Sequence, residues 1–354
     1  MIFFEVLLSF FFALAICLIA FLSFYLFVRK TWRKEYVKWD MMIDLLLRKA
    51  IFFHENNTGQ LALIPVTPRL KANLKNRRFC NQLVKKIIAA KRNMSGQHGE
   101  NLCHLYIQLG LDKKALRLLE SRKWHMRAYA IQQIGTMGLK AHLTKIYRYT
   151  NNKNDLVRIE AQIAVLNLFG FEGLRFLDVI SYQITEWQQI RLLKELSAVP
   201  QAELTGIDKW LNSGNPSVVI FALKLVRNYH RYELYEHIVS CLDHGDAAVR
   251  RQAISTLTEI YTENTSEKLL SKFEEETYKN QIAIMNAIAV IGDVQNVSTL
   301  LGYLEAEQHE MKFAVARAIV NGSANGLEYL INDPRSNTYP LSDMIPQLKS
   351  EIKW

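Results

Sequence analysis

The longest unbroken apolar stretch of the chain lies at its amino end. From Val6 to Val28 there is no charged residue and only two serines, Ser9 and Ser23. As a helix this run would be about 34 Å long, which is enough to cross the hydrocarbon core of a bilayer. Its start lacks the basic residues of a cleavable signal peptide, and no small-residue cleavage site follows it. The pattern therefore predicts an uncleaved transmembrane signal anchor over residues 1–28.

Four basic residues come directly after the apolar run and determine its expected orientation. Arg29, Lys30, Arg33 and Lys34 lie on the carboxyl side, whereas the amino side carries no Lys or Arg. Cytoplasmic flanks of membrane helices carry an excess of these residues. We therefore expect a single-pass protein of the bacterial inner membrane, with its amino terminus outside and its body in the cytoplasm.

Small side chains recur at every fourth position within the apolar run. Ser9, Ala13 and Cys17 would share one face of the helix. Small residues with this spacing allow a second membrane helix to approach closely, although they are also common in spans that pack against nothing. The three residues are therefore a candidate packing face inside the membrane.

Beyond residue 100 the apolar positions follow a helical spacing inside segments that themselves recur. Within one segment Ala253, Leu257 and Ile260 lie three and four apart, which is typical of a helix with one buried stripe. The corresponding inward position recurs every 30 or 31 residues, at Ala130, Ala161, Leu192, Leu223, Ala253, Ile284 and Val315. A period of this length fits one pair of helices per repeat, and such pairs must stack to bury their stripes.

Two of these segments share a further signature around the inward position. The sequences are DLVRIEA at 155–161, which reads D-x-V-R-x-x-A, and DAAVRRQA at 246–253, which has the same signature with one more residue after the Asp. This signature resembles HEAT repeats. The resemblance implies an α-solenoid, and it implies a ladder between adjacent repeats formed by Asp155, Arg158, Asp246 and Arg250. Gln189 and Ile220 replace the basic residue in two other copies, so the ladder would be interrupted there.

The expected architecture is all-α: a single N-terminal transmembrane helix followed by a HEAT-like α-solenoid of about six to seven helix pairs. Glycine (15) and proline (7) are scarce, which disfavours β-sandwiches and barrels. We expect an anchor (1–28), a basic juxtamembrane helical segment (29–98), the repeat array (99–332) and a C-terminal cap or tail (333–354). Within the basic segment, the pattern predicts one helix over 70–90.

The formal net charge of +10 is unevenly distributed along the chain. Residues 29–150 hold 25 Lys and Arg against 7 Asp and Glu, whereas residues 151–354 hold 19 against 26. Anionic lipid headgroups, an acidic partner or the protein's own acidic half would each attract the basic segment. Nucleic acid is disfavoured, because no stacked aromatic residues or nucleic-acid motif accompany the charge. The residues expected at the membrane surface are Arg29, Lys30, Arg33, Lys34, Lys71, Lys75, Arg77 and Arg78.

No catalytic or cofactor motif is found. The chain lacks a phosphate-binding glycine loop, a G-x-S-x-G elbow, an H-E-x-x-H motif and a kinase signature. The closest approach to a metal site is His237, Cys241 and His244, whose spacing would place them on one helical face. No fourth ligand accompanies them, and Cys241 falls on a core stripe. Four widely spaced cysteines without a CxxC motif favour a reducing compartment. We therefore expect no metal, no cofactor and no enzymatic activity.

The function expected from these features is that of a membrane-anchored, cytoplasm-facing scaffold that binds other proteins at the inner membrane surface. Its expected partners are proteins, an integral membrane enzyme among them, and anionic lipid headgroups. A narrower alternative is an accessory subunit of a membrane glycosyltransferase of exopolysaccharide synthesis, which single-span proteins with a cytoplasmic solenoid resemble. A basic HEAT-like nucleic-acid binder is a third, less favoured alternative.

Overall fold

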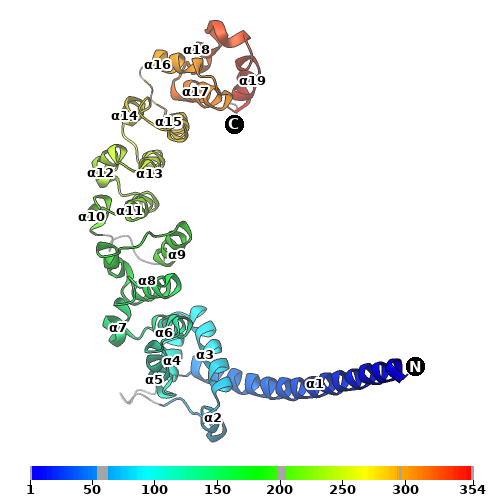
Figure 1. Ribbon diagram of the computed structural model, residues 1–354. Coiled ribbons are helices and arrows are strands. Elements are labelled where there is room, and N and C mark those ends of the chain that lie inside the picture. Colours follow the sequence, from blue (N-terminus) through cyan, green and yellow to red (C-terminus); the bar gives the residue numbers. More distant parts are fainter. Residues whose placement is uncertain (1, 54–62, 198–204, 293, 295–296, 352–354) are drawn as a thin grey trace. The chain divides into compact units, whose positions relative to one another are not determined.

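The computed structural model in Figure 1 describes residues 2–53, 63–197, 205–292, 294 and 297–351. Every regular element in these ranges is a helix, so the expected all-α class is confirmed there. The chain divides into two compact units. Unit 1 comprises residues 1–146 and 154–168, and unit 2 comprises residues 147–153 and 169–354.

Unit 1 is built from one very long helix and a set of shorter ones. They are α1 (Ile2–Ile51), α2 (Pro68–Asn73), α3 (Arg77–Arg92), α4 (Gly96–Gln108), α5 (Leu111–Leu119), α6 (Trp124–Thr136) and α8 (Asp155–Phe169); α7 (Leu143–Tyr147) and the 3-10 turn η1 (Lys140–His142) connect α6 to α8. The last turns of α1 pack against α3 and α4. Ile43, Leu46 and Ala50 are buried in this contact.

Helix α1 runs without a break for 50 residues. The domain boundary expected after residue 28 therefore lies within a continuous helix, and the boundary expected after residue 98 lies within α4. No glycine or proline occurs between Val28 and Ile51. Extending an existing helix costs less free energy than nucleating a new one, so the apolar run and the following polar run form one continuous helix.

The single helix expected over 70–90 is instead two helices. α2 ends at Asn73 and α3 begins at Arg77, with a short turn between them. The side chain of Asn76 accepts hydrogen bonds from the backbone N–H groups of Arg78 (2.9 Å) and Phe79 (3.4 Å). Asparagine favours this N-capping geometry over a mid-helix position. The break therefore follows from a capping residue that the apolar periodicity does not reveal.

Unit 2 consists of shorter helices that alternate with longer ones. They are α9 (Glu186–Leu196), α10 (Ile207–Leu211), α11 (Pro216–Asn228), α12 (Tyr235–Ser240), α13 (Ala247–Leu257), α14 (Thr265–Ser271), α15 (Tyr278–Ile291), α16 (Val297–Gly302), α17 (His309–Gly322), α18 (Gly326–Asn332) and α19 (Leu341–Glu351). Its 3-10 turns are η2 (Gly170–Asp178), η4 (Tyr232–Leu234), η5 (Cys241–Asp243), η6 (Tyr303–Glu305) and η7 (Pro334–Asn337).

Helix pairs stack along unit 2. Each longer helix packs on the shorter one before it, as α11 does on α10 and α17 does on α16, and the longer helices α11, α13, α15 and α17 pack on one another in sequence. All seven positions of the 30–31-residue series, from Ala130 to Val315, are buried. The expected helix-pair repeat and its inward position are thus confirmed. At the end, α19 packs on α17 and α18 with Leu341 and Leu348 buried.

Candidate functional site

The amino-terminal half of α1 exposes apolar side chains all around the helix. Between Phe10 and Phe27 the exposed large apolar residues are Phe10, Phe12, Leu14, Ile16, Leu18, Ile19, Phe21, Leu22, Phe24, Tyr25, Leu26 and Phe27. Among the described residues, α1 alone is long and apolar enough to cross a membrane by length and composition. Ala13 and Cys17 are exposed here, one turn apart, while the side chain of Ser9 lies outside the described residues.

The second half of α1 carries the basic cluster and then enters unit 1. Arg29, Lys30, Arg33 and Lys34 are all exposed. From Trp32 onward the helix has side chains that contact α3. The same helix therefore presents apolar side chains, then basic ones, and then residues of a packed core.

A polar cluster holds α1 against α3. The Lys86 ammonium lies 2.8 Å from Asp40 Oδ1 and 2.7 Å from Asp44 Oδ1. Gln82 Nε2 donates a further hydrogen bond of 2.8 Å to Asp40 Oδ1. The hydrogen bond from Lys86, and then that from Gln82, hold the pKa of the Asp40 carboxyl below its ordinary value. Asp40 is thus ionised at neutral pH and fixes the register of the two helices.

The carboxyl end of α1 is capped by side chains of α4. His98 Nδ1 lies 2.7 Å from the Ile51 carbonyl oxygen, and Asn101 Nδ2 donates to the Phe53 carbonyl over 2.8 Å. The last carbonyl groups of a helix have no partner within it, so such side chains stabilise its end. Because α1 is held both along its side and at its end, unit 1 is joined rigidly to the apolar half of α1.

A cation–π contact brings the start of α3 close to the basic cluster of α1. The Arg78 guanidinium carbon lies 3.5 Å from the centre of the Trp32 ring, and Phe79 packs edge-on against Trp39. Arg29 lies three residues before Trp32, one turn earlier on the same side of the helix, so Arg78 lies close to Arg29 along the helix. Arg78 is therefore at the level of the basic cluster of α1.

The other basic residues expected at the membrane surface do not all lie at the same position along the axis of α1. Lys71, Lys75 and Arg77 are exposed. Helix α2, which carries Lys71, is placed by the contact of Asn73 Nδ2 with Met42 Sδ at 4.0 Å. Met42 lies ten residues beyond Trp32, or about 15 Å along the helix axis. Lys71 is therefore well removed from the cluster that contains Arg78.

The four residues of the expected repeat ladder make different contacts. Asp155 Oδ1 accepts a hydrogen bond of 2.6 Å from Arg158, three residues later in the same helix. Asp246 caps α13, because its Oδ1 accepts from the Ala248 N–H over 2.7 Å. Arg250 reaches toward the next helix pair, where its Nε lies 2.5 Å and its Nη2 3.1 Å from the Glu276 carboxylate. Among these contacts, the Arg250 pair joins one repeat to the next.

Arg250 and Glu276 form a nearly buried ion pair. The Glu276 side chain is 4% exposed. Burial by itself would raise its pKa, but hydrogen bonds from Arg250 and Asn280 outweigh burial and hold the pKa below the ordinary value. Glu276 belongs to the run Glu274–Glu276. Its pairing with Arg250 cannot be read from that run, because the partner lies in the preceding helix pair.

The position three residues before each inward residue has a shared role in several repeats. Its side chain donates a hydrogen bond to a carbonyl in the loop before its own helix: Arg127 to Ser121 (2.9 Å), Gln189 to Ile184 (3.2 Å), Arg250 to His244 (2.8 Å) and Gln281 to Phe273 (3.0 Å). Arginine and glutamine can both do this, because both carry N–H donors at the end of a long side chain. The replacement of Arg by Gln therefore keeps the contact with the loop.

The residues nearest to a metal motif do not form a ligand set. His237 is exposed, while Cys241 is buried, and burial raises the pKa of its thiol to about 11. His244 Nδ1 accepts a hydrogen bond of 2.9 Å from the Asp246 N–H. Within the described ranges no three His, Cys, Asp or Glu side chains are arranged to hold a metal ion. These residues therefore serve the end of α12 and the start of α13.

Comparison with known proteins yields similarity to solved structures only. No protein-family model matches the chain. No curated protein matches it. An engineered protein of known structure is 16% identical over 81% of this chain and 89% of its own, with a TM-score of 0.40. The karyopherin Kap121p bound to Nup53p is 13% identical over 88% of this chain and 37% of its own, with a TM-score of 0.35. The chain thus spans little more than a third of Kap121p, and at these TM-scores the similarities carry no conclusion about function.

Proposed function

We propose that the protein is a membrane-anchored adaptor that binds other proteins at the cytoplasmic surface of a membrane. In this proposal α1 crosses the bilayer, the basic residues around Trp32 face anionic headgroups, and the stacked helix pairs hold protein partners. The observation that carries the proposal is the continuity of α1, whose first half is exposed and apolar and whose second half is fixed within unit 1.

The distribution of apolar side chains on α1 favours lipid over a protein groove as their surroundings. A helix that packs on one partner needs a single apolar stripe, whereas a helix that is apolar on all sides is typical of a membrane span. Exposed apolar surface of this extent is also rare in soluble proteins, where patches seldom exceed a few hundred Å². The absence of charge from Val6 to Val28 agrees with this placement.

The geometry of α1 and α3 supports a membrane-surface role for Arg78. Trp32 lies four residues beyond Val28, or about 6 Å along the helix axis. The headgroup layer on each side of a bilayer is about 5–8 Å thick. If Val28 marks the edge of the hydrocarbon core, Trp32 and the Arg78 guanidinium stacked on it lie among the headgroups. Tryptophan and arginine are both favoured at this depth.

The stacked helix pairs support the adaptor half of the proposal. Repeats of this kind present long continuous surfaces that suit protein binding. Helix α9 exposes two large side chains, Trp187 and Ile190, that take no part in the core. Exposed tryptophan is enriched where proteins bind one another. We therefore place partner binding on the helix pairs of unit 2, with a soluble protein or an integral membrane enzyme as the partner.

Topology and partner binding can be tested in the same membranes. Protease added to inverted inner-membrane vesicles should digest the body of the protein, whereas protease added to intact spheroplasts should leave it whole.

A photo-crosslinking amino acid at Trp187 should yield a discrete protein adduct, while the same amino acid at Leu223, which is buried, should yield none. Digestion in intact spheroplasts would refute the orientation. Identical adduct patterns from both positions would refute the adaptor role of α9.

A further inference from the structure

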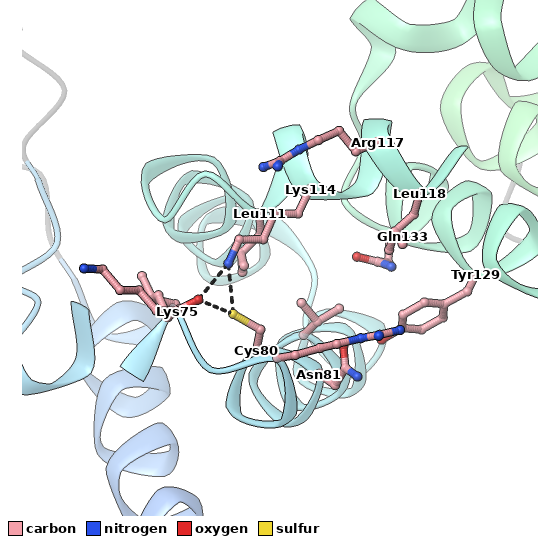
Figure 2. Close-up of a pocket in the computed structure, with 12 residues that line it drawn as sticks. Lys75, Cys80, Asn81, Leu111, Lys114, Arg117, Leu118, Tyr129 and Gln133 are labelled. Atoms are coloured by element: carbon pink, nitrogen blue, oxygen red, sulfur yellow. Dashed lines mark hydrogen bonds between the residues drawn. The ribbon is translucent and has the colours of Figure 1, made fainter. Parts of the chain in front are cut away.

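A pocket of about 310 Å³ lies within unit 1, between α3, α5 and α6 (Figure 2). Its lining combines apolar side chains with four basic ones, Lys75, Arg77, Lys114 and Arg117, and includes no Asp or Glu. The volume is at the lower end of the range for small-molecule sites, and a mixture of apolar walls with a few polar groups is typical of them. The basic lining predicts that any ligand is an anion.

The basic side chains of the pocket are not neutralised by the protein. None of the four takes part in an ion pair within the described residues, whereas Lys86 on the opposite side of α3 is paired with two carboxylates. Lys114 is held in place by neutral groups: its ammonium donates to the Leu74 carbonyl (2.9 Å) and to Cys80 Sγ (3.0 Å). An ammonium has three N–H donors, so one of them remains for a ligand.

A buried amide in the pocket is only half satisfied. Gln133 is 2% exposed, and its Oε1 accepts a hydrogen bond of 2.9 Å from the hydroxyl of Tyr106. This bond fixes the amide so that its Nε2 donor is left over, and Nε2 has no partner among the described residues. A buried donor that has lost its water and gained no partner destabilises the fold. Such a cost is tolerated at a binding site, where a ligand supplies the missing acceptor.

A second unpaired group lies one turn away on the same helix. The hydroxyl of Tyr129 is buried and has no hydrogen-bond partner among the described residues. Figure 2 shows Tyr129 and Gln133 reaching from α6 toward the space that Lys114 enters from α5, while Lys75 points away from its centre. Two neutral donors on α6 and an ammonium on α5 therefore line the same pocket, with the ammonium turned toward Cys80 and the Leu74 carbonyl.

We propose that this pocket binds a phosphate ester. Phosphate oxygens would accept hydrogen bonds from Lys114, Gln133 Nε2 and the Tyr129 hydroxyl, and the apolar part of the ester would lie against Leu111 and Leu118, which also line the pocket. A phosphate group offers several acceptor oxygens and a charge to a cluster of donors, which a single carboxylate matches less fully. The site goes beyond the adaptor role and does not depend on which proteins the helix pairs bind.

The position of the pocket makes a lipid headgroup one of two sources for this chemistry. Arg77 at its edge is the neighbour of Arg78, which is stacked on Trp32. On this side of the pocket lies the route by which a phospholipid withdrawn from the bilayer would reach Lys114, which is bound to the Leu74 carbonyl. A soluble phosphate ester from the cytoplasm would present the same phosphate group to the same donors.

The proposal is tested with the full-length chain in a non-ionic detergent, by isothermal titration calorimetry at physiological salt. The probes are sn-glycerol 3-phosphate for a soluble source and dihexanoyl phosphatidylglycerol for a lipid source. The Lys114→Met variant should weaken binding of at least one probe by about tenfold or more, the loss expected for a hydrogen bond to a charged group. Lys113→Met removes the same charge from an exposed neighbour outside the pocket and should change binding by less than about twofold.

Equal losses in Lys114→Met and Lys113→Met, or no saturable binding of either probe, would overturn the proposal. Tighter binding of the phosphatidylglycerol would identify the lipid source, and tighter binding of glycerol 3-phosphate the soluble one.

A Tyr129→Phe variant separates binding from folding. The hydroxyl has no hydrogen-bond partner in the described part of the chain, so its removal should leave the unfolding midpoint of the ligand-free protein unchanged or raise it. The same variant should weaken binding of the preferred probe by about threefold or more, because a neutral hydrogen bond to the ligand is lost. A lower unfolding midpoint together with unchanged affinity would show that the hydroxyl serves the fold, and would overturn the proposal.

Discussion

The two units treat their charged residues in opposite ways. In unit 2 cations face carboxylates of the same unit: Arg250 pairs with Glu276, Lys272 with Asp243 at 2.6 Å, and Arg335 with Asp333 at 2.7 Å. In unit 1 Lys86 and Arg158 are paired in this way, but Arg78 lies on an aromatic ring and no carboxylate lines the pocket that holds four basic residues. Both units nevertheless consist of packed helices.

This difference shows that the charge pattern of a unit does not follow from its helical architecture. Residues 29–150 carry 25 basic residues for 7 acidic ones, so most of these cations cannot be paired internally. Unpaired cations repel one another and destabilise a compact unit unless anions from outside compensate them. Residues 29–150 therefore hold an excess of cations, whereas residues 151–354 hold an excess of carboxylates with which their cations can pair.

The largest expected effect comes from preventing the insertion of α1 into the membrane. Changing both Leu14 and Leu18 to Arg should oppose insertion of α1 by about 5–7 kcal/mol in total, because each arginine near the centre of a span costs about 2.5–3.5 kcal/mol. The double variant should leave the carbonate-resistant membrane fraction. Changing Leu45, near the other end of α1, and Phe52, the residue after that end, to Arg is the matched control; both are exposed, and the protein should stay in the membrane.

The second effect concerns the repeat core of unit 2. Ile284 holds the inward repeat position of α15 and is fully buried, whereas Val290 in the same helix is exposed. Ile284→Ala should lower the local free energy of unfolding by about 3 kcal/mol through lost burial and a residual cavity. Val290→Ala should change it by less than about 0.5 kcal/mol. Hydrogen exchange of the α15 amides measures both, and similar losses would mean that the series does not mark the core.

The repeat core was the part of the fold that the sequence could predict. The inward series is a local property, because each member follows from apolar spacing within one helix and recurs with a nearly constant step. The long apolar helix at the amino end was predicted from its unbroken apolar run, which is also a local property. The turn at Leu74–Asn76 was missed, because Asn76 caps α3 inside an apolar pattern that continues on both sides.

The candidate sites were less accessible to sequence reasoning. Arg78 was expected at a membrane surface, but its contact with Trp32 joins helices far apart in the chain. Tyr129 and Gln133 gave no signal, since a lone tyrosine and a lone glutamine in an amphipathic helix are ordinary. A tertiary pocket and an unpaired donor exist only once three helices are packed, so no local pattern encodes them.

A third, smaller effect tests the internal pairing of unit 2. Arg250→Met leaves Glu276 with its bond from Asn280 but without its cation, and should cost about 2 kcal/mol of local stability. Lys279→Met, which removes an exposed cation without an ion pair, should cost almost nothing. Hydrogen exchange of the α13 amides is the measurement. Equal effects would mean that unit 2 gains no more from this pair than from a free surface charge.

The same ion pair should make unit 2 sensitive to acid. The pKa of Glu276 is lower in the folded protein than its ordinary value of 4.5, so its contribution to stability is complete above pH 4.5 and is lost as the pH falls toward the folded pKa. Protection of the α13 amides should therefore decline below about pH 4.5. In Glu276→Gln this decline should be weaker, and an unchanged pH profile would show that another group controls the acid response.

The smallest effect tests which basic residues of unit 1 lie close to the membrane surface. Arg78 lies beside Trp32, among the headgroups if α1 spans the membrane, whereas Lys71 lies near the level of Met42. Met42 is about 21 Å beyond Val28 along the helix, which is farther than the headgroup layer and a Debye length of about 8 Å combined. A basic residue close to an anionic surface contributes about 1 kcal/mol, and a distant one much less.

The full-length protein in nanodiscs should therefore gain thermal stability from phosphatidylglycerol relative to phosphatidylcholine. Arg78→Gln should remove about 2–4 °C of that gain, the shift expected for about 1 kcal/mol in a unit of this size. Lys71→Gln carries the same charge change and should remove less than half as much. Equal losses would mean that the charge of unit 1 acts as a diffuse whole, and no loss in Arg78→Gln would place its guanidinium away from the lipid.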